Sequence, residues 1–157
     1  MNDLLCTMPR IPEELPYGFH INWINLVDND TGEVLWHTND NYAISGNKFN
    51  TITVKIPRKV LDCKALTRTI SFTSTHRIDY LKMRHRELVS LQCVHEWVSE
   101  FGTVLPDLNE TWETTFTHKE GISSSSANCL SGDLVMETSF YNGDKFIGST
   151  KILLYFQ

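Results

Sequence analysis

The C-terminal end of the chain decides the fold. It reads LVMETSFY (residues 134–141), NGD (142–144) and KFIGSTKILLYFQ (145–157). In the first run Met136, Thr138 and Phe140 lie on one face, and in the last run Ile152 and Leu154 repeat the same alternation. A period of two residues is typical of a β-strand, and Asn-Gly-Asp is a strong turn signal. These residues therefore predict a β-hairpin.

Further runs along the chain alternate in the same way. Residues 49–56 place Ile52, Val54 and Ile56 on one face before Pro57 ends the run, and residues 66–73 alternate similarly. Residues 19–27 and 33–37 are two more strand candidates on either side of a turn-rich segment. Many short alternating runs separated by turns favour an all-β fold, either an antiparallel sandwich or a barrel.

The segment 76–101 supports two interpretations. Leu81, Met83 and His85 share one face of a strand, whereas the later apolar residues keep a spacing that suits a helix. Periodicity alone does not decide between strands and a helix here.

Composition limits the possible functions. The chain has 157 residues, 41% of them apolar and 21% charged, which suits one globular domain. Its net charge of −5 lacks the basic footprint of a nucleic-acid-binding protein. No stretch approaches the roughly 20 apolar residues of a membrane span, so stable membrane insertion is not expected. The first 16 residues lack the pattern of a signal peptide.

The cysteines and the catalytic motifs point away from metal sites and enzymes. Cys6, Cys63, Cys93 and Cys129 stand far apart without any zinc-binding spacing, which predicts a reduced cytosolic protein without a metal or other cofactor. No Gly-x-Ser-x-Gly, His-Glu-x-x-His or phosphate-binding glycine loop occurs. We therefore expect a binding protein rather than an enzyme, with lipid chemistry inside the sandwich as the catalytic alternative.

Three polar residues occupy positions where core side chains are expected. Arg68 lies between Leu66 and Ile70, Thr138 interrupts an apolar face, and His85 continues another. A buried arginine is costly unless it is paired. Arg68 could pair with a buried acid, reach the rim with its head group, or line a pocket and donate hydrogen bonds to a ligand. His85 alone would more often be a structural histidine.

Four ordered blocks of sequence resemble the prenyl-binding protein delta family, the delta subunits of cyclic-GMP phosphodiesterase. The blocks are GFHINWINL with TGEVLW (18–26, 31–36), IPRKVLDCKA (56–65), EWVSEFG with VLP and TW (96–102, 104–106, 111–112), and LSG with ETSF (130–132, 137–140). The similarity runs from about Gly18 to the C-terminus. It divides the chain into a leader of residues 1–17 and a domain of residues 18–157.

The resemblance implies both a fold and a function. The fold is an immunoglobulin-like β-sandwich of two antiparallel sheets that enclose a hydrophobic lipid pocket. The function is that of a non-catalytic carrier, which binds farnesyl or geranylgeranyl tails and extracts prenylated proteins from membranes. Ras-, Rho- and Rab-like small GTPases and phosphodiesterase catalytic subunits are the implied cargo, and Arf-like GTPases in the GTP state are the implied releasing partners. A cytoplasmic monomer is implied, with the cilium as a second compartment to consider.

The resemblance also implies which residues bind the prenyl chain. The family's pocket positions correspond to Ile24, Leu26, Trp36, Tyr42, Val60, Leu61, Cys63, Arg68, Ile70, His85, Trp97, Phe116, Leu130, Met136, Thr138, Phe140, Ile152, Leu154 and Phe156. His85 stands where the best-known members have Gln, Ile24 where they have Met, and Phe116 where they have a smaller aliphatic residue. Residues 117–128 diverge most. Two alternatives stay open: a carrier of N-myristoylated proteins, as in the sister family, and a structural phosphodiesterase subunit.

Overall fold

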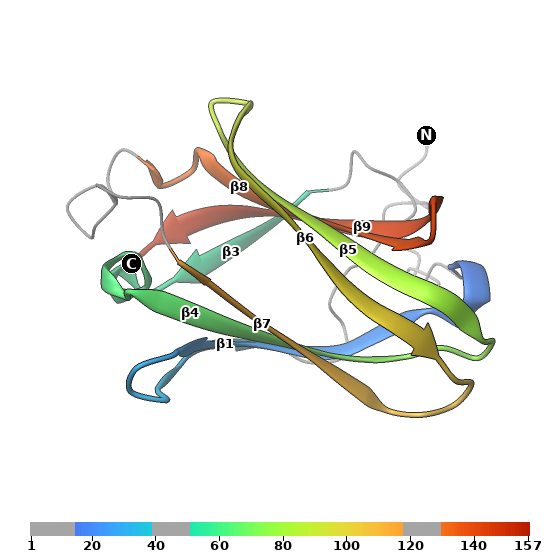
Figure 1. Ribbon diagram of the computed structural model, residues 1–157. Helices are drawn as coiled ribbons and strands as arrows, with labels where there is room; N and C mark the ends of the chain where they lie inside the picture. The colour runs from blue at the N-terminus through green and yellow to red at the C-terminus, as the bar shows by residue number, and fades with distance from the viewer. Residues whose placement is uncertain (1–14, 39–50, 118–129) are drawn as a thin grey trace, which may run out of the picture.

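Two β-sheets pack face to face in this protein (Figure 1). The computed structural model describes residues 15–38, 51–117 and 130–157. One sheet has four strands in the order β2-β1-β4-β7, and the other has five in the order β3-β9-β8-β5-β6. Their bounds are β1 (His20–Asp28), β2 (Val34–Thr38), β3 (Ile52–Ile56), β4 (Ala65–Thr73), β5 (Ile78–Val89), β6 (Gln92–Val104), β7 (Glu110–Thr117), β8 (Leu134–Asn142) and β9 (Lys145–Phe156).

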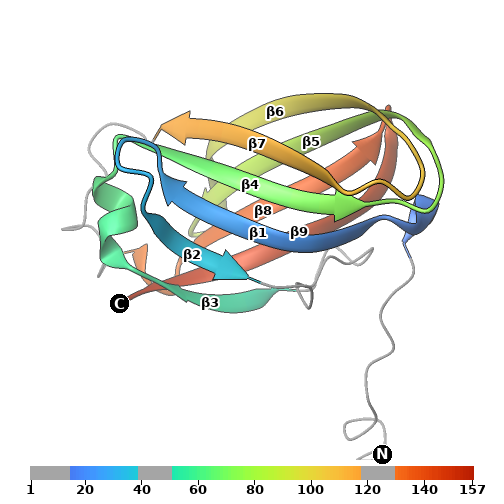
Figure 2. The same ribbon diagram turned by 90° about the horizontal axis from the view of Figure 1, so that it is seen from below.

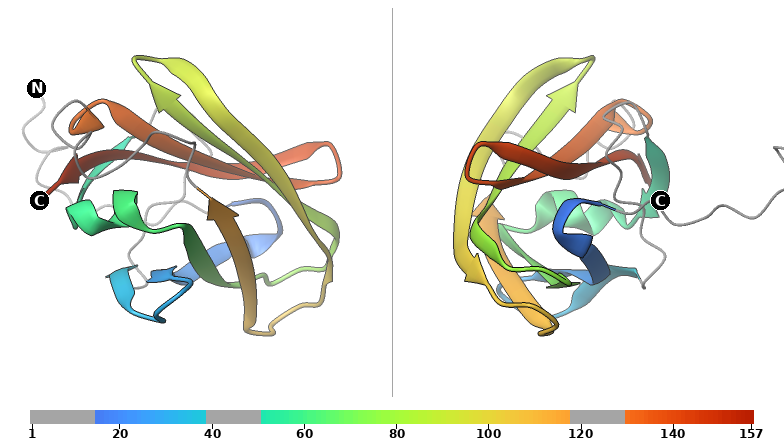
Figure 3. Two further views of the ribbon diagram at one scale, coloured as in Figure 1. Left: turned by 60° about the vertical axis from the view of Figure 1, so that its left-hand side comes forward. Right: turned by 90° about the vertical axis from the view of Figure 1, so that its right-hand side faces the viewer.

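The architecture is the predicted immunoglobulin-like sandwich. Figures 2 and 3 show the two layers from below and from their ends. Two short 3₁₀ helices, η1 (Pro16–Gly18) and η2 (Arg58–Asp62), flank the strands. Within the described ranges, no helix is long and apolar enough to cross a membrane.

The predicted C-terminal hairpin is confirmed. β8 and β9 pair antiparallel, with Thr138 opposite Thr150 and Glu137 opposite Lys151. Gly143 in the connecting turn has a φ of 57°, a conformation that glycine adopts without steric cost. The inward faces of both strands are those predicted from the alternation.

The ambiguous middle segment forms two strands, so the helical interpretation is wrong. β5 and β6 pair antiparallel through a tight turn at Ser90 and Leu91, whose φ angles are 50° and 66°. Two successive left-handed residues match the twist of a hairpin. This turn lacks the usual Asn-Gly or Asp-Gly signal, which is why the sequence left the segment undecided.

One feature of the predicted fold needs correction. β3 pairs with β9 in the parallel direction, with Ile52 opposite Ile152 and Ile56 opposite Phe156. The five-stranded sheet is therefore mixed rather than wholly antiparallel. The reason is the route of the chain, because β2 belongs to one sheet and β3 joins the edge of the other beside the last strand. Alternation along β3 is unaffected, and its Ile52–Val54–Ile56 face still points inward.

Aromatic side chains fill one end of the sandwich. Phe72 contacts Phe19, Phe101 and Trp112 at ring-centroid distances of 5.6, 5.1 and 6.3 Å, and Phe140 lies 5.1 Å from Phe19. Phe19 directly precedes β1, and the other rings come from the ends of β4, β6 and β8 and from the start of β7. Large interlocking rings leave little space there, so any lipid-sized space must lie toward the opposite end.

Two residues assigned to the leader pack against the domain. Leu15 is 4% exposed and belongs to the core. The Tyr17 carbonyl accepts hydrogen bonds from the backbone N–H groups of Thr75 and His76, and its hydroxyl accepts one from the Asn142 side chain. This segment therefore helps to close the aromatic end.

Candidate lipid-binding site

Two adjoining hollows lie between the sheets. The space between their lining side chains is ≈ 500 Å³ in the first and ≈ 520 Å³ in the second, and both volumes include space open to solvent. They share the lining residues Leu26, Ile56, Met136 and Leu154, so they lie next to each other, and the two together are called the passage below.

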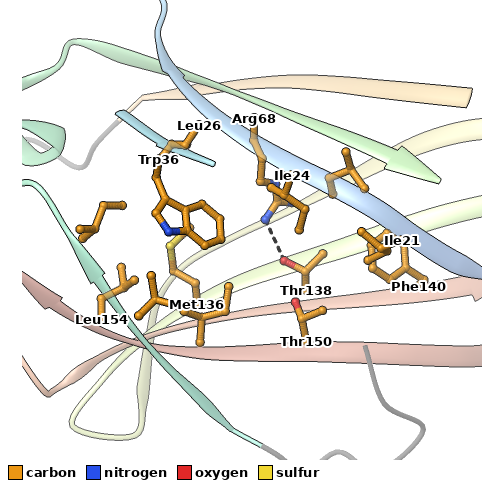
Figure 4. A pocket seen from close by; sticks show the side chains of 14 residues that line it. Ile21, Ile24, Leu26, Trp36, Arg68, Met136, Thr138, Phe140, Thr150 and Leu154 are labelled. Atoms are coloured by element: carbon orange, nitrogen blue, oxygen red, sulfur yellow. Dashed lines mark hydrogen bonds between the residues drawn. The ribbon is translucent and has the colours of Figure 1, made fainter. Parts of the chain in front are cut away.

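The first hollow occupies the middle of the sandwich (Figure 4). Arg68 enters it from β4, and Thr138 and Thr150 enter it from β8 and β9 on the facing sheet. The remaining lining is apolar: Ile21, Ile24, Leu26, Trp36, Val54, Ile56, Ile70, Met136, Phe140, Ile152 and Leu154. Such a wall suits a hydrocarbon chain, with a small polar spot on one side.

The second hollow continues toward the end of the sandwich away from the aromatic cluster. Residues of η2, the end of β7 and the start of β8 contribute to its lining. Its lining consists of Leu26, Ile56, Val60, Leu61, Leu66, Glu87, Val89, Val94, Phe116, Leu130, Leu134, Met136, Leu154 and Phe156. Glu87 is the one charged side chain of this lining among the described residues.

The three polar residues that interrupt the core faces meet at one point. The Arg68 guanidinium donates a 2.9 Å hydrogen bond from Nη1 to Thr138 Oγ1, crossing between the sheets (Figure 4). Nη1 also lies 3.4 Å from His85 Nδ1, and Nη2 lies 3.2 Å from the Met83 sulfur. Arg68 is 6% exposed, which excludes the alternative of a head group at the rim.

The hydrogen bonds define the protonation of His85. A guanidinium only donates, so His85 Nδ1 must accept from Arg68. Thr138 Oγ1 lies 3.1 Å from the same nitrogen, so its hydroxyl and the guanidinium share the single lone pair of Nδ1. Burial, together with the Arg68 charge, lowers the pKa of His85 to about 4, although Glu87 acts in the opposite direction. The ring is therefore neutral near pH 7, with its proton on Nε2.

Aromatic rings pack against the His85 and Arg68 side chains of this cluster. The Trp97 indole stacks on the His85 imidazole at a centroid distance of 4.7 Å, and the Arg68 guanidinium carbon lies 5.6 Å from the Trp97 ring. Cation–π contact of this kind stabilises a buried arginine. Phe116 completes the layer 5.8 Å from Trp97. The cluster is thus a fixed polar spot in an apolar wall.

A comparison with known protein families identifies the relatives of this chain. The family model described as GMP-PDE, delta subunit, matches residues 13–156. The chain belongs to the GMP-PDE delta-subunit family. The resemblance to prenyl-binding delta proteins is thereby confirmed for almost the whole chain, and members of this family are non-catalytic binding subunits.

Most of the site residues expected for this delta-subunit family member line the two hollows. Ile24, Leu26, Trp36, Arg68, Ile70, Met136, Thr138, Phe140, Ile152 and Leu154 line the first, and Val60, Leu61, Phe116, Leu130 and Phe156 line the second. His85 and Trp97 stand behind the wall instead, in contact with Arg68. Cys63 lies outside both linings, and Tyr42 falls outside the described residues.

Several lining residues were missed. Four of them, Val54, Ile56, Leu66 and Leu134, lie on the alternating apolar faces already predicted, so taking every residue of those faces would have included them. Ile21 could not be found in this way, because a β-bulge between Ile21 and Trp23 shifts the alternation. The other lining residues that the sequence analysis did not name are Glu87, Val89, Val94 and Thr150.

The polar groups around the site limit what it could hold. Across residues 15–38, 51–117 and 130–157, no three His, Cys, Asp or Glu side chains gather closely enough to hold a metal ion. The polar groups that line the first hollow are the Arg68 guanidinium and the hydroxyls of Thr138 and Thr150, which can donate hydrogen bonds to a carbonyl group. The arrangement can therefore hold an apolar chain and orient one polar group beside it.

Proposed function

We propose that this protein binds the farnesyl or geranylgeranyl tail of prenylated proteins in the passage between its sheets. The observation that supports this most strongly is the continuous apolar lining, interrupted in the first hollow by the Arg68–Thr138 spot. A prenylated, methylated C-terminus has the same character, with a long hydrocarbon chain beside one carbonyl-bearing cysteine.

The energetics suit a carrier that takes lipid from a membrane and gives it back. Burying the roughly 15 carbons of a farnesyl chain at about 0.8 kcal/mol each gives an upper bound of about 12 kcal/mol relative to water. A bilayer provides a similar gain, so transfer from membrane to protein is nearly balanced. The contacts beside the cysteine then determine whether the cargo leaves the membrane.

A balanced transfer is also easily reversed. Coupling of about 1–3 kcal/mol from a second protein is enough to shift occupancy by one or two orders of magnitude. We propose that a GTP-bound Arf-like GTPase supplies it by pairing with an exposed strand edge. Among the described strands, β2, β7, β3 and β6 are the sheet edges on which such a partner could add. The cargo would be Ras-, Rho- or Rab-like GTPases and phosphodiesterase catalytic subunits, carried through the cytoplasm.

A fluorescence titration tests the proposal. A dansylated farnesyl-cysteine methyl ester should bind saturably at one site per chain, and unlabelled geranylgeranyl-cysteine should displace it. A myristoylated glycine peptide should compete much more weakly. Preferential displacement by the myristoyl peptide would instead identify a carrier of N-myristoylated proteins. A flat titration with folded protein would contradict lipid carriage and leave the structural-subunit alternative.

A further inference from the structure

The turn between β5 and β6 exposes a leucine at the end of the sandwich where the second hollow lies. Val89 and Val94, on either side of this turn, line that hollow. Leu91 is 89% exposed, the highest value for a large apolar side chain in the part of the chain that the structure describes. Figure 1 shows the β5–β6 hairpin projecting beyond the other strands at this end. One exposed leucine is ordinary by itself, so its backbone and its neighbours decide what it means.

The backbone of this turn is unfavourable for leucine. Ser90 and Leu91 have φ angles of 50° and 66°, and a two-residue turn of this kind favours Asn-Gly, because a Cβ atom is disfavoured in the left-handed region. The Ser90 N–H and hydroxyl donate hydrogen bonds of 3.0 and 2.9 Å to the Asp133 carboxylate, which fixes the turn to the start of β8. Leu91 is thus held outward in water with a steric cost that glycine would not have. Strain of this kind on an exposed apolar residue points to a contact made in another state.

The outer face of the five-stranded sheet is apolar beside this turn. Leu88 is in register with Cys93 on one side and with Val135 on the other, and Val135 is in register with Leu153. These side chains form a row across β6, β5, β8 and β9. Tyr155, 41% exposed, follows on the same face of β9, two residues nearer the end. Together with the exposed leucine they make up the rim patch: Leu88, Leu91, Cys93, Val135, Leu153 and Tyr155.

A row of alternating charges runs beside the rim patch. Arg86 is in register with Glu96 and Glu137, and Glu137 is in register with Lys151. Arg86 Nη2 lies 2.6 Å from Glu137 Oε1, and Lys151 Nζ lies 3.5 Å from Glu137 Oε2. Two positive and two negative side chains leave the row without net charge. An apolar rim with a tyrosine, followed by balanced charges, matches the change from hydrocarbon to zwitterionic head groups at a bilayer surface.

We propose that the rim patch docks this protein on the surface of a phospholipid bilayer, with Leu91 inserted at the boundary of the acyl chains. A prenyl tail then passes from the membrane into the passage without crossing water. This inference rests on the proposed prenyl-binding function. The rim patch borders the end of the sandwich that holds the second hollow, so docking through it turns the lipid site toward the membrane. A tail that leaves through water exposes its whole apolar surface at once, which makes that route slow.

Extraction kinetics test the proposal with the full chain. A fluorescent farnesylated, methylated peptide is bound to phosphatidylcholine vesicles that contain a quenching lipid, and its removal is followed with increasing protein in excess. The rate should rise in proportion to protein concentration, because docking precedes transfer. Leu91→Gly relieves the backbone strain and should reduce this dependence about 10-fold, the order expected for losing the burial of one leucine side chain. Leu108→Gly removes a 46% exposed leucine between β6 and β7, at the aromatic end, and should leave it unchanged.

Titration of the same peptide without vesicles separates the two hypotheses. Its affinity should be equal in the wild-type protein and both variants. If the peptide binds but its extraction rate does not depend on protein concentration, escape into water limits transfer, and docking is refuted while prenyl binding stands. Equal extraction rates for Leu91→Gly and the wild type would also refute docking and leave the rim patch as a surface for a protein partner. If the peptide does not bind in solution, the proposed function itself fails.

Discussion

The substitution Met136→Trp is the sharpest test of where the lipid lies. Met136 projects from β8 and lines both hollows at the place where they join. An indole at this position should block the passage and confine a ligand to the second hollow. If about half of a farnesyl chain, roughly seven carbons, is then left unburied at about 0.8 kcal/mol each, binding weakens by about 6 kcal/mol, or roughly four orders of magnitude.

The fold should survive this change. Overpacking a filled core costs about 1–3 kcal/mol, and here the added ring has a hollow to occupy. Val135→Trp is the matched control, because Val135 is the adjacent residue on the opposite face of the same strand. Probe titration and thermal unfolding of both variants provide the assay. A folded Met136→Trp protein with wild-type affinity would refute the placement of the lipid between the sheets.

Three further perturbations follow from the polar cluster and the cysteines. Arg68→Ala should weaken binding of a prenylated, methylated peptide more than binding of free prenol, and calorimetry showing equal losses would remove its polar role. The pKa of His85 falls from 6.5 in the unfolded chain to about 4 in the folded protein. Folding stability is therefore at its full value above pH 6.5, where the ring is neutral in both states, and decreases as the pH falls toward 4, where the folded protein must take up a proton on a buried ring. Stability should drop by about 3 kcal/mol from this group alone over that window. Urea unfolding of His85→Gln should show a correspondingly flatter pH profile, and an unchanged profile would contradict a buried neutral imidazole. Burial, with the nearby Asp28 carboxylate, raises the pKa of Cys63 to about 11. Its alkylation at pH 8 should be about 100-fold slower than that of an ordinary thiol, as followed by mass spectrometry, and rapid labelling would argue against this environment.

Alternation was enough to predict an all-β fold and its inward faces, and the resemblance to the delta family then favoured a sandwich over a barrel. The run 134–157 contains both a clear period of two and an Asn-Gly turn, and its hairpin forms as predicted. The segment 76–101 contains two competing periods, and its turn at Ser90 and Leu91 carries no recognisable signal. Pairing between strands, rather than local preference, decides its structure.

The polar cluster shows what the sequence could and could not reveal. Arg68, His85 and Thr138 are conspicuous because each interrupts an apolar face, so their inward position was predictable. Their convergence was not, since it depends on β4 packing against β5 and β8 across the two sheets. Glu87 follows His85 by two residues, so its inward position was available from the same alternation, but a charged residue was not expected there.

The most direct test of lipid burial is an isotope-filtered NMR measurement on the complex with a farnesylated, methylated peptide. We predict nuclear Overhauser contacts from the isoprenoid methyl groups to the Met136 and Ile24 methyl groups, which face the first hollow from opposite sheets. A saturated complex whose isoprenoid contacts only outward-facing residues such as Val135 and Leu153 would contradict the account.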